Sequence, residues 1–281
     1  MTRADIINEL ENRGYKAEEY NTIKNDIEME GIRIHAEESD LIPVIYTKKF
    51  IEEYNAGLTN INDIVDTIIK TLERLKEIKI DTGVFKNKDR MLDNIYIGFQ
   101  KESNQSDIIK KKSEFDGIEE YLYIRENLKD GEIYTSKISQ KLIDYANISI
   151  EEAWKKAEIN TIAETKLESM HKIFEDILGI EYTEDIDENN PMFVISNEIK
   201  NKGAACILNK KILVDFANRF NVKKIVLLPS SIHEMIVLPY FDGMDENELN
   251  EMVRQVNVTE VNPTERLTDR AYILEIWGSE E

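Results

Sequence analysis

The chain has 281 residues, of which 41% are apolar and 33% are charged. That apolar content excludes a disordered chain, and the length predicts one large domain or two small ones. With 36 Lys and Arg against 56 Asp and Glu, the formal charge is −20, which argues against direct nucleic-acid binding through a broad phosphate footprint.

Targeting signals are not apparent in the sequence. The first residues form a charged helical pattern without the apolar segment of a secretory signal. The longest apolar runs, such as residues 225–228, are far shorter than the roughly 20 residues that cross a membrane. The single cysteine, Cys206, cannot form an intrachain disulfide. We therefore expect a cytoplasmic protein with no membrane partner.

The N-terminal third mixes helical and strand patterns. Capping residues followed by apolar residues at helical spacing predict three helices, which start after Thr2, Thr47 and Asn60. Alternating and β-branched residues predict a hairpin made of residues 31–35 and 42–46. Residues 15–30 fit either a helix or a strand.

The middle of the chain carries shorter signals. Alternation at Ile95, Ile97 and Phe99 predicts a strand, and residues 121–124 and 132–135 are typical of two strands around a turn at Gly131. Between these patterns, the run Lys110-Lys111-Lys112 predicts a solvated loop or a helix end, with a recognition patch as the alternative.

The second half starts with a helix and ends in mixed structure. Ser149 and Glu152 form a capping box, and helical spacing continues with a break to Gly179. Short apolar runs then alternate with a helix over 210–220 and another that starts at Asp245. This succession, without strict βαβ repetition, predicts an α+β fold with mixed sheets and flanking helices, not a doubly wound parallel fold.

The acidic stretch 181–190 is the best linker candidate. We therefore divide the chain into an N-terminal α+β region (1–148), a helical region with the linker (149–190) and a C-terminal α+β region (191–281). One continuous domain is the alternative.

Three segments carry a family resemblance. Residues 203–208 (Gly-Ala-Ala-Cys-Ile-Leu), 228–234 (Leu-Pro-Ser-Ser-Ile-His-Glu) and 252–257 (Met-Val-Arg-Gln-Val-Asn) resemble an uncharacterised bacterial family. Its members are found in clostridia-like anaerobes, often in phage-like or conjugative elements. The resemblance covers most of the chain and is weakest over 78–145. It implies a fold and a mobile-element setting, but no reaction and no catalytic residues.

The sharpest cluster of reactive side chains is Ser230, Ser231, His233 and Glu234, between two predicted strands. A serine hydrolase needs a hydroxyl within hydrogen-bond reach of an imidazole that an acid orients. Residues two or three apart on an extended chain rarely meet in that geometry, and the Gly-x-Ser-x-Gly elbow is missing. A turn is therefore the favoured interpretation, and a hydrolase using Ser230 or Ser231 with His233 is the alternative.

Other candidate sites have less support. Cys206 lies in an apolar run, where burial makes a thiol inert, and a Cys206–His233 pair is the alternative. Glu168-x-x-His171 is half of a di-iron motif without a second copy. The calcium-like start at Asp185 lacks the required glycine and the closing glutamate. We therefore predict no metal and no cofactor, and we favour a binding protein over an enzyme.

Charge is distributed unevenly along the chain. Residues 151–190 hold twelve acids against four Lys or Arg, and residues 242–281 hold eleven against three. Residues 200–224 reverse this, with seven basic residues and one acid. Acidic faces can imitate the phosphates of nucleic acid and occupy the basic groove of a nuclease or effector. General solubility is the alternative interpretation.

We therefore predict a non-catalytic acidic binding protein, encoded by a phage or mobile element. It would act as a counter-defence inhibitor, in the manner of anti-CRISPR proteins, on a basic nucleic-acid-handling host protein. The residues expected to contact that partner form two acidic sets: Glu181, Glu184, Asp185, Asp187 and Glu188, then Asp242, Asp245, Glu246, Glu248 and Glu251. A further alternative is a structural or regulatory protein whose basic patch at 200–224 touches nucleic acid.

Overall fold

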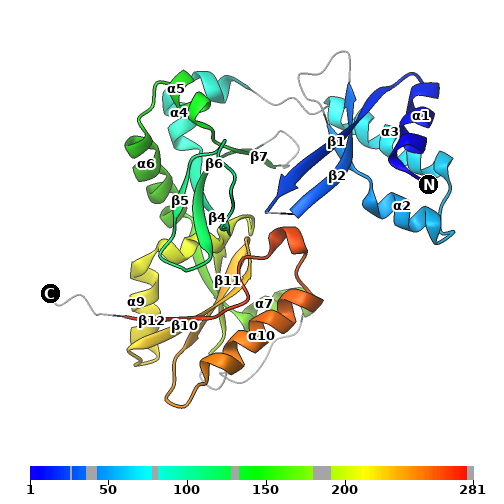
Figure 1. The fold of residues 1–281 in the computed structure, drawn as a ribbon. Coiled ribbons are helices and arrows are strands. Elements are labelled where there is room, and N and C mark those ends of the chain that lie inside the picture. Colours follow the sequence, from blue (N-terminus) through cyan, green and yellow to red (C-terminus); the bar gives the residue numbers. More distant parts are fainter. Residues whose placement is uncertain (26, 36–42, 78–81, 128–132, 180–190, 277–281) are drawn as a thin grey trace. The chain divides into compact units, whose positions relative to one another are not determined.

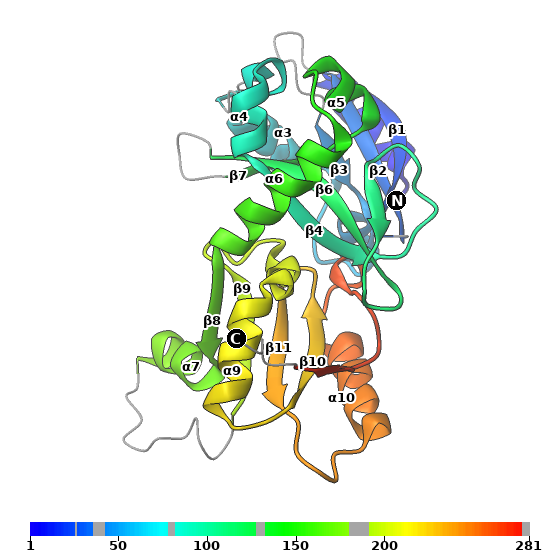
Figure 2. The same ribbon diagram turned by 90° about the vertical axis from the view of Figure 1, so that its left-hand side faces the viewer.

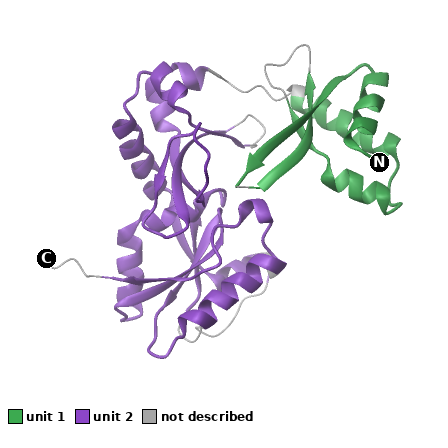
Figure 3. Ribbon diagram, viewed as in Figure 1, with its two compact units in different colours: residues 1–81, 128–130 green, residues 82–127, 131–281 purple. Residues whose placement is uncertain are grey.

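The computed structural model describes residues 1–25, 27–35, 43–77, 82–127, 133–179 and 191–276 (Figure 1). The chain divides into two compact units (Figure 3). Unit 1 is Met1–Asp81 with Leu128–Asp130, and unit 2 is Thr82–Asn127 with Gly131–Glu281. The boundaries that the sequence suggests after residues 148 and 190 both fall inside unit 2.

Unit 1 packs helices on a three-stranded antiparallel sheet. The strands are β1 (Lys16–Lys24), β2 (Ile27–His35) and β3 (Val44–Tyr46), paired in that order. The helices are α1 (Arg3–Asn12), α2 (Lys48–Asn55) and α3 (Ile61–Glu77). The core combines Ile6 and Leu10 of α1, Ile32 and Ile34 of β2, and Val65 and Ile68 of α3. This confirms the three predicted helices and the pairing of β2 with β3.

The ambiguous residues 15–30 form β1 and the first part of β2. Nine consecutive residues of each strand pair across the β1–β2 ladder, from Lys16↔His35 to Lys24↔Ile27. Only one face of β1 and β2 packs against the helices, so the buried positions are too few to give a clear alternation in the sequence. Backbone pairing across the ladder fixes the strand conformation here.

Unit 2 contains a four-stranded antiparallel sheet with helices around it. Its strands are β4 (Ile95–Lys101), β5 (Lys110–Lys112), β6 (Ile118–Asn127) and β7 (Ile133–Lys137). β4, β5 and β7 all pair with β6. The nearby helices are η1 (Thr82–Lys86), α4 (Lys88–Asp93), α5 (Gln140–Tyr145) and α6 (Ile150–Ala163).

The second sheet of unit 2 has five antiparallel strands. Their order is β12 (Tyr272–Glu275), β10 (Lys224–Ser231), β11 (Glu234–Pro239), β9 (Phe193–Asn197) and β8 (Thr165–Ser169). Helices of this region are α7 (Met170–Leu178), η2 (Gly203–Leu208), α9 (Lys210–Arg219), α10 (Glu246–Thr259) and η3 (Pro263–Glu265).

Helices α9 and α10 cover opposite faces of this sheet (Figure 2). Ile225 and Leu227 of β10 enter the large core that contains Leu213 of α9. Val226 and Leu228 face the other way and pack with α10. All strand pairs of the described residues are antiparallel, so the molecule has the predicted α+β class.

Three segments differ from the sequence-based expectation. Lys110–Lys112 is a strand that pairs with β6, and Lys110 and Lys111 also form ion pairs with the buried carboxylates of Glu119 and Glu120, while Lys112 lies near Glu102. Residues 165–169 form strand β8 within the predicted helical stretch. The apolar run 204–208 is the short helix η2, which is buried among both sheets of unit 2.

Several of the remaining elements start or end where the sequence indicates, and the helices α4, α5, η1 and η3 have no counterpart among the predictions. Ser149 accepts a hydrogen bond from the Glu152 backbone at the start of α6, and Gly179 closes α7 with a left-handed φ of 66°. The turn predicted at Gly131 and the linker predicted over 181–190 lie outside the described residues. Within the described ranges, no helix is long and apolar enough to cross a membrane.

Candidate functional site

The four-stranded sheet has a polar, aromatic face opposite its core. Successive side chains of a strand point to opposite faces, and the buried core takes one set: Ile95, Ile97, Phe99, Ile118, Leu122 and Ile124. The intervening positions of β4 and β6 form the other set: Tyr96, Gly98, Gln100, Glu119, Tyr121, Tyr123 and Arg125. The register adds Lys110 opposite Tyr121 and Lys137 opposite Tyr123. We call this surface the tyrosine face.

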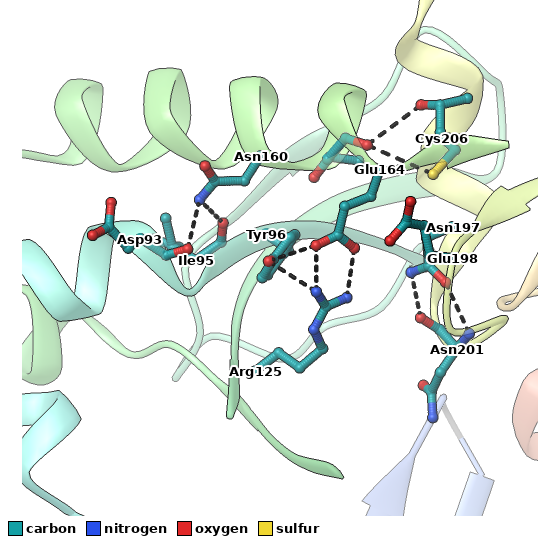
Figure 4. A network of polar contacts seen from close by, with 12 residues as sticks. Asp93, Ile95, Tyr96, Arg125, Asn160, Glu164, Asn197, Glu198, Asn201 and Cys206 are labelled. Atoms are coloured by element: carbon teal, nitrogen blue, oxygen red, sulfur yellow. Dashed lines mark hydrogen bonds and ion pairs between the residues drawn. The ribbon is translucent and has the colours of Figure 1, made fainter. Parts of the chain in front are cut away.

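At one end of the tyrosine face, Arg125 is completely paired (Figure 4). Its guanidinium donates to both oxygens of Glu164, at 2.8 and 2.5 Å, and to the Tyr96 hydroxyl at 2.9 Å. The Tyr96 hydroxyl donates in turn to Glu164 at 2.8 Å. Burial and this bond to Glu164 raise the pKa of Tyr96 to about 12. We call these three residues the arginine corner, and its charges balance.

The centre of the tyrosine face consists of two buried phenols. Tyr121 and Tyr123 are 2% and 1% exposed, and their ring centroids are 6.1 Å apart. Tyr121 fits because Gly98 has no side chain: a Cβ there would lie 2.6 Å from Tyr121 Cζ. Among the described residues neither hydroxyl has a protein hydrogen-bond partner, and neither oxygen is among the fully buried polar atoms left without one, so both hydroxyls keep some contact with solvent. Burial raises the pKa of both phenols, so both are neutral donors.

Glu119 holds the negative charge at the opposite end of the face. Its carboxylate accepts hydrogen bonds from Gln100 Nε2 at 2.6 Å, Ser103 Oγ at 2.7 Å and Lys110 Nζ at 2.9 Å. Burial acts to raise the pKa of Glu119, but the bonds from Lys110, Gln100 and Ser103 outweigh it and hold the pKa below its usual value. The charge of Lys110 is therefore matched by Glu119.

Among the described residues, Lys137 and Lys202 are cations of this face that have no carboxylate partner. Lys137 Nζ donates to Gln100 Oε1 at 2.6 Å and lies 4.8 Å from the Tyr121 ring centroid. Lys202 Nζ lies 5.8 Å from the Tyr123 ring centroid. Within the part of the chain that the structure describes, no Asp or Glu oxygen lies within 4.0 Å of either ammonium group. We call these two lysines with Tyr121 and Tyr123 the lysine corner.

The pKa values of both lysines reflect this environment. Burial, followed by the positive charge of Lys202, lowers the pKa of Lys137 to about 8. Burial also lowers the pKa of Lys202, and the charge of Glu265 acts in the opposite direction. The charge of Lys202 thus disfavours the protonated form of Lys137, and neither ammonium group has a carboxylate within 4.0 Å among the described residues.

Lys202 is held in place by a strained loop between β9 and η2. Lys200 and Lys202 have left-handed φ angles of 52° and 55°, a conformation that costs a non-glycine residue about 1–2 kcal/mol. The Asn197 side chain clasps the loop, since it accepts from the Asn201 N–H at 3.1 Å and donates to the Asn201 carbonyl at 2.7 Å. Backbone strain of this kind concentrates at functional sites.

His233 completes the support of this loop. Its Nδ1 accepts a hydrogen bond from the Lys202 N–H at 3.2 Å, which places the ring proton of the neutral imidazole on Nε2. Nε2 lies 3.6 Å from the Glu265 carboxylate. The carbonyl of His233 also accepts from the Ser196 hydroxyl at 2.8 Å. His233 therefore acts on Lys202 as a positioning residue.

The serines of the predicted hydrolase cluster contact other groups. The Ser231 hydroxyl accepts from the backbone N–H of His233 at 3.0 Å, and the Ser230 hydroxyl donates to Glu234 at 3.4 Å. Ser231 and Glu234 are also paired across the β10–β11 hairpin. The structure thus brings the four residues together at a strand end, and the imidazole bonds to the Lys202 backbone instead of to a serine hydroxyl.

The first predicted acidic set, at 181–188, lies outside the described residues. All members of the second set are exposed: Asp242, Asp245, Glu246, Glu248 and Glu251. Asp245 caps α10 by accepting from the Asn247 N–H at 2.8 Å, and Glu251 pairs with Arg254 at 2.6 Å. Met252 and Val256 of the same helix are 48% and 40% exposed. We call the second acidic set together with these two apolar residues the α10 surface.

The basic patch predicted over 200–224 is partly neutralised. Lys200 pairs with Glu168 at 3.3 Å, Lys224 pairs with Glu275 at 3.1 Å, and Lys210 pairs with Glu114. Lys202 differs from these residues because it lies against the tyrosine face.

The other candidate groups do not form a reactive centre in the described part of the chain. Cys206 is buried, and burial raises the pKa of its thiol to about 12. Glu168, half of the di-iron pattern, pairs with Lys200. The calcium-like start at Asp185 lies outside the described residues. Among those that are described, no group of three or more His, Cys, Asp or Glu side chains could hold a metal ion.

A model of a family of unknown function, DUF5688, matches residues 2–275. The chain belongs to this family. Membership confirms the resemblance to an uncharacterised family and assigns no reaction. No curated protein and no solved structure matches the chain.

The tyrosine face was not predicted from the sequence, although a signal for it is present. The alternation of Ile95, Ile97 and Phe99 identifies the core face of β4, and the skipped positions Tyr96 and Gly98 belong to the opposite face. In β6 the skipped positions again carry tyrosines and an arginine. Aromatic and charged residues at the non-core positions of two paired strands are the pattern that indicates such a site.

Proposed function

We propose that this protein binds an anionic ligand on the tyrosine face, with Lys137 and Lys202 as the counter-charges. The observation that carries the proposal is the pair of partly buried ammonium groups without a carboxylate within 4.0 Å among the described residues. The two ammonium groups offer donors only, and each tyrosine hydroxyl can add one donor, which suits a ligand that supplies negative oxygen acceptors.

The physical reason is the cost of desolvating a charge. A buried ammonium group loses its hydration, and proteins compensate by pairing it with an opposite charge. The same face follows this rule at Arg125, which has Glu164, and at Lys110, which has Glu119. Lys137 is the exception on the sheet itself. A bound anion supplies the missing partner and relieves the repulsion between the two lysines.

Thermal unfolding in the presence of anions tests this proposal. At constant ionic strength, sodium phosphate is expected to raise the unfolding temperature of the wild type, because a ligand at about 100 times its Kd adds about 2.7 kcal/mol to the free energy of unfolding. Lys202→Met is expected to remove the increase. Lys200→Met is the matched control, since Lys200 has the same backbone conformation but pairs with Glu168. An equal increase in all three proteins contradicts the proposal.

We also propose that the α10 surface contacts a basic partner protein. Exposed acids beside the apolar side chains of Met252 and Val256 favour this, because protein interfaces combine an apolar centre with a polar rim. More specifically, we propose that the protein is encoded by a phage or mobile element and acts in the cytoplasm. There it would use the α10 surface to inhibit a nucleic-acid-handling host protein.

Charge reversal on α10 tests the second proposal. Wild-type protein on a resin is expected to retain a basic nucleic-acid-handling protein from host extract at low salt, and Glu248→Lys with Glu251→Lys is expected to release it. Glu151→Lys, which reverses an exposed acid on α6, serves as the control. Identical capture by the wild type and the α10 variant contradicts a role for this surface.

A further inference from the structure

We infer that the ligand of the lysine corner carries a phosphate monoester group, and that the site recognises this group in preference to a carboxylate. This inference rests on the proposed anion binding and names the chemistry of the anion. Three independent features of the described residues support it: the number of unmatched charges, the number of unmatched donors and the occupation of the aromatic rings.

Two cations of the face have no carboxylate within 4.0 Å among the described residues. Arg125 is paired with Glu164 and Lys110 with Glu119, whereas Asp107 acts on Lys137 and Glu265 acts on Lys202 only from beyond that distance. A carboxylate would neutralise one of these ammonium groups and leave the other without a partner. A phosphate monoester carries a charge of about −1.5 to −2 at pH 7, so it can neutralise both.

The lysine corner has more free hydrogen-bond donors than the two oxygens of a carboxylate can accept. Lys202 Nζ has no hydrogen-bond acceptor in the described part of the chain, and Lys137 uses two of its three protons on Gln100 and Gln105. The hydroxyls of Tyr121 and Tyr123 can each donate one further hydrogen bond, since neither has a protein partner among the described residues. A phosphoryl group presents three strong acceptor oxygens, which matches this excess of donors better than the two oxygens of a carboxylate.

The aromatic rings are already occupied by cations. Lys137 lies 4.8 Å from the Tyr121 centroid, Arg125 lies 4.1 Å from the Tyr96 centroid, and Lys202 lies 5.8 Å from the Tyr123 centroid. Stacking of a nucleobase on these ring faces would displace the cations that give the site its charge. The recognised group is therefore the phosphoryl group, and we expect no preference for a nucleotide.

The pH dependence of binding follows from the ionisable groups around the lysines. Lys137 is surrounded by Lys202, Glu119, Asp107 and Lys110, and Lys202 by Glu265. A phosphate monoester gains its second negative charge near pH 6, so affinity rises through that range. Lys137 loses its proton near pH 8 in the free protein, so affinity falls above that pH.

Isothermal titration with three anions tests the inference. Glycerol phosphate is expected to bind at least tenfold more tightly than acetate at pH 7, and its affinity is expected to peak between pH 6 and 8. Sulfate remains a dianion across this range, so its affinity is expected to fall only above pH 8.

The outcomes distinguish recognition of a phosphate group from the binding of anions in general. Equal affinity for acetate and glycerol phosphate overturns the phosphate inference and leaves anion binding intact. Absence of binding by all three anions overturns the proposed function itself. Tighter binding of adenosine monophosphate than of glycerol phosphate, by tenfold or more, contradicts the conclusion that only the phosphoryl group is recognised.

Variants locate the binding site. Lys137→Met and Lys202→Met are each expected to weaken glycerol phosphate binding at least tenfold, whereas Lys200→Met is expected to change it less than twofold. Met retains most of the length of the lysine stem and removes an unpaired charge, so both variants are expected to fold. Unchanged affinity in Lys137→Met and Lys202→Met overturns the assignment to the lysine corner.

Discussion

The arginine corner and the lysine corner lie on the same face of the same sheet, and they treat positive charge differently. At the arginine corner, Glu164 accepts two hydrogen bonds from Arg125 and one from Tyr96. At the lysine corner, Lys137 and Lys202 lie against tyrosine rings without a carboxylate within 4.0 Å among the described residues. All three cations lie against a tyrosine ring, and Arg125 is buried whereas the two lysines are half-buried, so the clearest difference is the missing anion.

This difference separates a structural ion pair from a binding site. A buried ion pair whose hydrogen bonds are all formed favours one arrangement of the side chains around it. It has no free donor or acceptor with which to bind a ligand. Unpaired cations with free donors have the opposite property: they weaken the empty fold and strengthen the complex. The backbone at Lys202 is strained, and Asn197 and His233 hold it in that conformation. The surrounding structure therefore keeps Lys202 in an unfavourable position.

The largest expected effect on stability comes from removing the carboxylate that pairs with Arg125 at the arginine corner. Glu164→Ala leaves Arg125 without its carboxylate, and we expect a loss of about 2–4 kcal/mol in the free energy of unfolding, measured by urea denaturation. Glu168→Ala, which removes the partner of the more exposed Lys200, is the control and is expected to cost less than about 1 kcal/mol. Equal losses in the two variants would show that the arginine corner is not a buried pair.

The next largest effect on stability concerns Tyr121, one of the two rings of the lysine corner. Gly98→Ala places a methyl group against Tyr121, and we expect a loss of about 1–3 kcal/mol in the free energy of unfolding. The double variant with Tyr121→Leu provides the control, because the smaller side chain makes room for the methyl group. If Gly98→Ala is as costly in that background as in the wild type, the close approach of Tyr121 is not the cause.

Much of the fold follows from local sequence patterns. Capping residues such as Thr2, Ser149 and Asp245 mark helix starts, and alternation at Ile95, Ile97 and Phe99 identifies β4. These patterns are reliable because each depends on neighbouring residues only. The strands at Lys110–Lys112 and Thr165–Ser169 depend instead on the strands with which they pair, β6 across a short hairpin and β9 farther along the chain, and their own residues do not indicate these partners.

The candidate site was harder to anticipate for the same reason. Lys202 belongs to a basic run in the sequence, and nothing near it indicates that it alone reaches the tyrosine face. His233 stands beside two serines, yet its ring binds the backbone of Lys202, 31 residues earlier in the chain. Local composition described which reactive groups exist, and tertiary contacts decided which of them meet.

Removing a charge from the lysine corner is expected to stabilise the empty protein. Lys137→Met is expected to raise the free energy of unfolding at pH 7 by about 1–2 kcal/mol, because the folded state holds the ammonium group less favourably than water does. Since its pKa in the folded protein is about 8 and lies below the unfolded value, wild-type stability is expected to rise above pH 8, and that rise is absent in the variant.

Lys111→Met is the matched control for this prediction. Lys111 pairs with the buried Glu120 and contacts the Trp154 ring, so its removal is expected to destabilise the protein. If both lysine variants are destabilised equally, Lys137 does have a partner in the free protein, and the contrast between the corners disappears.

The smallest effect concerns the support of the Lys202 loop. His233→Leu removes the acceptor of the Lys202 N–H, and we expect a loss of about 1 kcal/mol in the free energy of unfolding together with weaker glycerol phosphate binding. Ser231→Ala is expected to change the free energy of unfolding by less than about 0.5 kcal/mol and to leave binding unchanged. Weaker binding in Ser231→Ala alone would assign the support of the loop to the serine.

The central claim is that Lys137 and Lys202 are unpaired in the free protein and bind an anion. Nuclear magnetic resonance of the lysine side chains tests this claim most directly. The pKa of Lys137 is measured from its Cε and Nζ resonances in the free protein and in the presence of saturating glycerol phosphate. We predict a value near 8 that rises toward the ordinary lysine value when the ligand binds. An unchanged titration curve for Lys137 with the ligand bound elsewhere, or with no ligand bound, would contradict the account.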